Sequence, residues 1–207
     1  MASTASPYGL RAVNELGGLP YAGSTRTFLI DPAGYNTNIF NGSVVYVNSS
    51  GYLNIVTGTG ADGTTNSFPG SGTLTGAVGV FVGCSYYNAQ GQLIFSQYYP
   101  ANTTGVVQAL VIDDDRTVFQ AQADGSVAQT SLGNNTYFAA AQSTSTGSTT
   151  TGNSTSAVTA TTITTTAAFR IVGFANIAGF SQVGDAYTDV LVKFNPGYHS
   201  YSNAVGV

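Results

Sequence analysis

Short runs of β-branched and aromatic residues, each ended within a few positions by Gly, Asn, Asp or Pro, recur from Arg26 onward. This pattern constrains the fold most, because such runs favour strands and the residues between them favour turns. We therefore predict an all-β domain over residues 26–207, a barrel or sandwich of many short antiparallel strands. A subdivision of this domain near residues 124–133 is left open.

Three pairs of apolar runs predict β-hairpins. The first pair flanks residues 48–51, the second flanks residues 88–91, and the third flanks residues 113–116. Each connection is rich in Asn, Asp, Ser or Gly, the residue types that favour tight turns.

The remaining segments are predominantly polar. Residues 57–73 predict a long loop, and Asp124 is expected to cap a short helical turn over residues 126–130. Residues 143–166 are almost wholly Ser, Thr, Gly and Ala. Because Thr is β-branched and tolerates a half-exposed pleated surface, we expect strands or ordered loops there rather than a flexible linker.

Residues 1–25 combine frequent Gly and Pro with apolar residues that follow no steady period. This composition predicts an extended N-terminal arm that lies on something outside its own domain, with a frayed terminus as the alternative. The candidate contact residues are Tyr8, Leu10, Arg11, Val13, Leu19 and Tyr21.

Charged residues make up only 7% of the chain, against about a quarter in a typical soluble protein. Thirteen Tyr and eleven Phe argue against disorder. The five basic residues are scattered, which argues against a nucleic-acid partner, because phosphate binding needs clustered cations. No apolar run reaches the length of a signal peptide or a membrane span, so we expect synthesis in a reducing cytoplasm and no membrane partner.

The chain has few groups suited to acid–base catalysis. His199, Cys84 and Glu15 are its only histidine, cysteine and glutamate, and no Gly-x-Ser-x-Gly elbow is present. We assign His199 a structural or contact role, because it lies in a polar-aromatic segment near the C-terminus. Cys84 ends an apolar strand and is expected to pack in the core. The sequence predicts no enzymatic activity and no cofactor.

Two groups of carboxylates are candidate sites. Residues 113–115 are three adjacent aspartates, but they lack the alternate spacing of a calcium loop. We interpret them as a solvated turn partly neutralised by Arg116, and predict no metal site. Asp185 and Asp189 could form a glycosidase pair, but nothing else in the sequence supports it.

Three stretches together resemble a family of tailed-phage head decoration, or capsid cement, proteins. They are residues 6–13 (SPYGLRAV), residues 118–128 (VFQAQADGSVA), and residues 170–174 with 183–195 (RIVGF and VGDAYTDVLVKFN). The resemblance lies in apolar and glycine positions, and it leaves residues 143–148 and 198–203 unmatched.

The resemblance implies a structural virion protein that is made in the host cytoplasm and binds the outer surface of a phage capsid. Its partner would be the major capsid protein, contacted through the arm residues above, and it would assemble as a homotrimer. Three alternatives stay open: a tail or receptor-binding fibre protein, a carbohydrate-binding β module and, least favoured, a hydrolase.

Overall fold

The computed structural model describes residues 4–61, 68 and 76–203, and these residues form three antiparallel sheets that pack together. Sheet A has the order β1 (Arg11–Glu15), β10 (Thr117–Gln122), β13 (Asp189–Phe194), β12 (Phe169–Phe174), β11 (Asn135–Thr136). Sheet B has the order β2 (Arg26–Ile30), β9 (Val107–Ile112), β6 (Gly79–Tyr87), β4 (Val44–Val47), β5 (Leu53–Ile55), with β7 (Leu93–Ser96) also paired to β6. A small third sheet joins β3 (Ile39–Phe40) and β8 (Tyr98–Tyr99).

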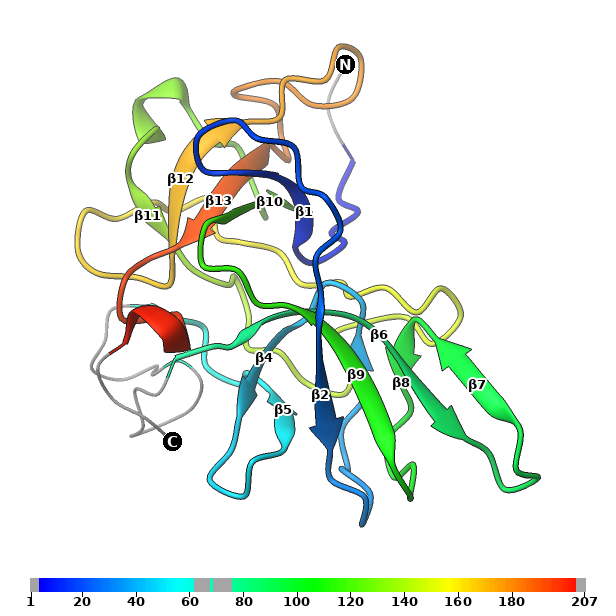
Figure 1. Cartoon of the computed structure of the whole chain (residues 1–207). Coiled ribbons are helices and arrows are strands. Elements are labelled where there is room, and N and C mark those ends of the chain that lie inside the picture. Colours follow the sequence, from blue (N-terminus) through cyan, green and yellow to red (C-terminus); the bar gives the residue numbers. More distant parts are fainter. Residues whose placement is uncertain (1–3, 62–67, 69–75, 204–207) are drawn as a thin grey trace.

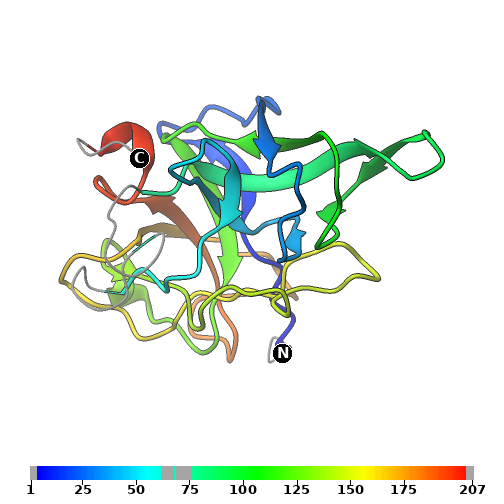
Figure 2. The ribbon, with the colours of Figure 1, turned by 90° about the horizontal axis from the view of Figure 1, so that it is seen from below.

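Sheets A and B occupy the upper and lower parts of the molecule in Figure 1. The described residues contain no α-helix, so the predicted all-β class is confirmed, and the packed sheets are consistent with a sandwich. Figure 2 shows that the hairpin of β6 and β7 projects from the rest of the chain.

Two clusters of buried side chains form the core. The larger cluster takes more side chains from sheet A than from sheet B, together with many from loops, and contains a group of aromatic rings around Phe169. The smaller cluster is supplied mainly by sheet B and by the third sheet, and includes Phe81 and Tyr99. Val44, Val80 and Ile112 of sheet B belong to the larger cluster, so the two sheets share part of the core.

The first two predicted hairpins are confirmed, because β4 pairs with β5 and β6 pairs with β7. The third is wrong. Strand β9 already has β2 and β6 on its two edges, and β10 has β1 and β13, so neither strand has an edge free for the other. Residues 113–116 instead carry the chain from sheet B to sheet A.

The N-terminal segment is part of sheet A. Strand β1 pairs antiparallel with β10, and Leu10 lies in the larger core cluster. Gly9 makes this possible: its φ is +74°, and its backbone passes so close to Gly42 that a Cβ would lie 2.5 Å from the Gly42 carbonyl oxygen. The prediction that this segment is ordered by contacts outside its own domain is therefore wrong for residues 9–15, which are ordered by β10 and the core.

The polar segments are mostly ordered without regular strands. Residues 143–166 contain turns and isolated bridges such as Asn41 to Asn153, which fits the expected ordered loops. A single turn of 3-10 helix covers Gln129–Ser131, and Asp124 accepts a hydrogen bond from Ala160 instead of capping it. Most of the predicted loop 57–73 lies outside the described residues.

Candidate functional site

The contact residues predicted in the N-terminal segment do not form one surface. Leu10 is 2% exposed, so its selection as a partner contact is wrong: its side chain completes the core. Val13 and Leu19 are exposed, while Tyr21 is half-buried and packs against the larger core cluster. The segment is mainly a structural element of sheet A.

Tyr8 and Arg11 make internal contacts that attach the segment to β13. The Tyr8 hydroxyl donates a hydrogen bond to Asp189 at 2.9 Å, and the Arg11 guanidinium lies 4.3 Å from the centre of the Tyr8 ring. Burial raises the pKa of Tyr8, and the Asp189 carboxylate raises it further. Burial also raises the pKa of Asp189, against the lowering effect of its hydrogen bonds with Tyr8 and Ser181. This pair tethers the N-terminal segment to the sheet.

Asp185 and Asp189 do not form a catalytic pair of carboxylates. Asp185 accepts a hydrogen bond from the Gln182 backbone in a surface turn, whereas Asp189 is buried against Tyr8. Each carboxylate is thus engaged in a local structural contact.

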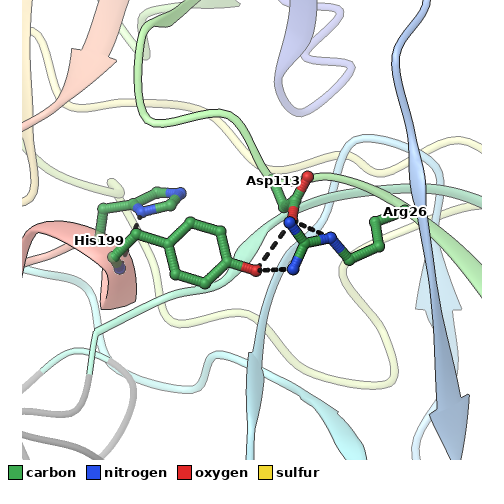
Figure 3. Close-up of polar contacts among 4 residues, drawn as sticks. Arg26, Asp113 and His199 are labelled. Carbon is green, nitrogen blue, oxygen red and sulfur yellow. Dashed lines mark hydrogen bonds and ion pairs between the residues drawn. The ribbon is translucent and has the colours of Figure 1, made fainter.

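A polar cluster joins β2, the connection between β9 and β10, and the C-terminal turn (Figure 3). Arg26 Nε lies 2.9 Å from Asp113 Oδ2, and the Tyr201 hydroxyl donates to the same oxygen at 2.8 Å. The partner of Asp113 is therefore Arg26 and not the predicted Arg116. Within the described ranges, no group of three His, Cys, Asp or Glu residues is suited to hold a metal ion.

His199 adjoins this cluster but is 1% exposed. Its Nδ1 accepts a hydrogen bond from the Tyr201 backbone at 3.3 Å, and its ring packs against Phe194. Burial lowers the pKa of His199, while the carboxylates of residues 113–115 act in the opposite direction. This arrangement supports the structural role assigned to His199 from the sequence.

Cys84 packs in the smaller core cluster, as predicted. Burial raises the pKa of its thiol to about 12. Since the thiolate is the reactive form of cysteine, this side chain is not suited to act as a nucleophile at neutral pH.

A group of exposed apolar side chains lies on one side of sheet B, on both sides of the polar residues Gln108 and Ser85. Six large apolar side chains there are 40–79% exposed, and we call them the apolar face. Its members are Leu29, Tyr87, Leu93, Phe95, Val106 and Leu110.

Strand register places these six side chains on one side of the sheet. Leu29 lies opposite Gln108, which lies opposite Ser85, which in turn lies opposite Phe95. Val106 and Leu110 lie two positions from Gln108, on either side of it. Tyr87 lies two positions from Ser85, and Leu93 lies two positions from Phe95. Alternate residues of a strand share a face, so all six side chains lie on the same side. A groove of about 280 Å³ between Phe95 and Val106 runs along the face.

The apolar face carries no charge of its own. Arg26 is the only charged residue in the four strands β2, β6, β7 and β9, and it pairs with Asp113. Edge strands exposed to solvent commonly carry charged residues or Pro, which discourage association. Strand β7, with the sequence LIFS, has neither.

The apolar face was not predicted from the sequence. Residues 93–96 are apolar on both sides of the strand, a pattern typical of a strand covered on both faces. From the sequence we predicted these residues only as part of the second hairpin, without assigning either side to a contact surface. In the structure only one side is covered, and Phe95 on the other side is 79% exposed. The apolar residues on both sides of this short strand were therefore the signal in the sequence that could have indicated a contact surface.

Comparison with known proteins gave no match to a protein-family model, to a curated protein or to a solved structure. Among the described residues, no helix has the length and apolar character needed to span a membrane.

Proposed function

We propose that the protein is a structural virion protein that binds the outside of a phage capsid and stabilises it, as a head decoration or cement protein does. The observation that carries the proposal is the apolar face on a domain with very few charges. The sequence resemblance to decoration proteins supplies the kind of partner, the major capsid protein.

The size of the apolar face suits a protein contact. Its six side chains leave on the order of 600 Å² exposed, the upper end of the largest apolar patch found on typical monomers. A standard interface buries about 800 Å² on each partner, so this face could form its apolar centre. Tyr87 belongs to the residue types enriched among those that dominate binding energy, and Phe95 to the aromatic types enriched in interfaces.

The mechanism is stabilisation by added contact. Each bound copy would bridge neighbouring capsid subunits, and burial of apolar side chains would oppose their separation under the pressure of the genome. A protein that binds only the assembled shell stabilises that shell by mass action. Assembly as a trimer would give each trimer three linked contacts with the capsid, and therefore a higher avidity than a single copy has.

A binding experiment with purified particles tests the proposal. Heads prepared without the protein, and separately purified tails, are incubated with it and sedimented, and the bound copies are counted on a gel. We expect saturable binding to heads, none to tails, and a higher temperature of genome release from decorated heads. Saturable binding to tails alone would instead identify a tail protein, and binding to neither particle would overturn the proposal.

The salt dependence of binding tests the apolar character of the contact. Apolar burial is not weakened by sodium chloride, whereas ion pairs are screened within about 3 Å at 1 M salt. Affinities at about 0.05 M and 1 M salt should therefore agree within about tenfold, or ~1.4 kcal/mol. A hundredfold loss at high salt would show that charged residues dominate.

A further inference from the structure

The C-terminal turn, residues 198–203, is held against the body of the protein around one histidine. Two backbone hydrogen bonds flank His199: Ala77 N donates to the Tyr198 carbonyl at 2.8 Å, and Ser200 N donates to the Ala77 carbonyl at 2.7 Å. The Tyr201 hydroxyl extends the attachment to Asp113. These contacts join the turn to residues far away in the sequence.

The imidazole ring of His199 is held in its neutral form by its hydrogen bond. Nδ1 accepts a hydrogen from Tyr201 N, so the single ring proton must be on Nε2. Nε2 is buried without a hydrogen-bond partner, and the ring lies between Phe194, at 5.4 Å, and Tyr201, at 5.2 Å. A second proton would have to enter at Nδ1, where it would face the N–H of Tyr201.

The charged groups near the ring do not remove the repulsion between a proton on Nδ1 and the N–H of Tyr201. Asp113, Asp114 and Asp115 face it from the connection between β9 and β10 and favour its charged form. Asp113 is already paired with Arg26 of β2 and with the Tyr201 hydroxyl. Desolvation of the ring outweighs the three carboxylates and the Val78 backbone, which act in the opposite direction, so the pKa of His199 is lowered.

We propose that His199 is an acid-sensitive latch, whose protonation releases the turn 198–203 from Ala77 and Asp113. The latch is a property of this chain alone and does not depend on the proposed capsid partner. It adds a conformational response to a histidine that otherwise packs in the core and accepts a hydrogen bond from Tyr201 N.

The pH range in which the turn is released follows from the difference in pKa between the released and the latched histidine. A released histidine titrates near pH 6.5, whereas the latched ring accepts a proton only at lower pH. The latched form is therefore unaffected above about pH 6.5 and loses stability as the pH falls from there to the pKa of the latched ring. Within this window, the ratio of latched to released turn falls by up to about tenfold per pH unit.

Hydrogen exchange and NMR on the intact protein test the latch between pH 7.5 and pH 4.5. His199 is the only histidine of the chain, so its ring signals need no assignment. We expect an Nε2–H tautomer at pH 7.5 and a protonation midpoint below 6.5. Exchange of the Ser200 and Ser202 amides, corrected for the intrinsic rate, should rise over the same pH range.

The control variant is His199→Asn, in which an amide oxygen can replace Nδ1 as acceptor but does not titrate. Its turn should show no change in corrected exchange over that range. The proposal is overturned if the ring of the parent titrates at or above pH 6.5. It is also overturned if the ring titrates and the exchange of the Ser200 and Ser202 amides does not become faster. The same pH dependence in His199→Asn would also overturn it, since the aspartates would then be responsible.

Discussion

Replacement of Phe169 by alanine should destabilise the protein more than almost any other single change. The Phe169 side chain is 0% exposed, and its ring centre lies 5.1 Å from that of Phe138, 5.2 Å from Phe194 and 6.0 Å from Phe68. All four aromatic residues belong to the larger core cluster, and they come from separate parts of the chain. Removal of this ring therefore leaves a cavity at the junction of several segments.

The magnitude follows from the burial. A Phe-to-Ala change in a packed core costs about 3–5 kcal/mol, and each aromatic pair contributes about 0.5–1.5 kcal/mol beyond its buried area. We expect a loss of about 4–5 kcal/mol for Phe169→Ala, a large share of the ~5–15 kcal/mol of a typical domain. At roughly 2–4 °C per kcal/mol for a chain of this size, Tm should fall by about 8–20 °C.

Urea unfolding followed by far-UV circular dichroism measures this loss, with Phe95→Ala as the matched control. Phe95 is 79% exposed, so the same substitution there should change the free energy of unfolding by no more than about 0.5 kcal/mol. The slope of the unfolding free energy against urea should stay the same in both variants. A loss below about 1.5 kcal/mol for Phe169→Ala, or equal losses for the two variants, would refute the assignment of the core.

Three further predictions concern single residues. Gly9→Ala should lower the free energy of unfolding by at least about 2 kcal/mol in urea titration, because a Cβ would meet Gly42 and the residue has a positive φ. Cys84 should react with a thiol reagent at pH 8 at least about a hundredfold more slowly in the folded than in the unfolded protein, because burial raises its pKa to about 12. Asp189→Asn keeps an acceptor for Tyr8 and removes a carboxylate whose pKa is raised by burial. This variant should be at least as stable as the parent at pH 7, with any gain lost below about pH 4 in a pH series of urea titrations, since the folded state favours the neutral acid.

Local sequence patterns were enough to predict the all-β class and the first two hairpins, but not strand β1. The turn at residues 48–51 determines its own hairpin, because the strands on both sides have no nearer partners. Residues 113–116 look equally suitable, but the pairing of β9 with β2 and β6 depends on segments far away in the sequence. Competition between distant strands for an edge is not visible in a local pattern.

The candidate sites depended on long-range contacts in the same way. Arg116 is the nearest basic residue to Asp113 in the sequence, yet the sheet brings Arg26 to it. The glycines of the N-terminal segment suggested an arm ordered by contacts outside its own domain, whereas Gly9 allows a close backbone approach that buries Leu10. The apolar face was missed because composition does not reveal which side of β7 is covered.

The central claim, that the apolar face of sheet B binds the capsid, is tested most directly by one titration with two matched variants. Phe95 and Phe180 are 79% and 77% exposed, but only Phe95 belongs to the apolar face. Heads without the protein are titrated with the parent, with Phe95→Ser and with Phe180→Ser, after circular dichroism has confirmed that all three are folded. We predict that Phe95→Ser binds at least about tenfold more weakly, a loss of ~1.4 kcal/mol or more, and that Phe180→Ser binds like the parent. Unchanged binding of Phe95→Ser, or an equal loss in both variants, would contradict the account.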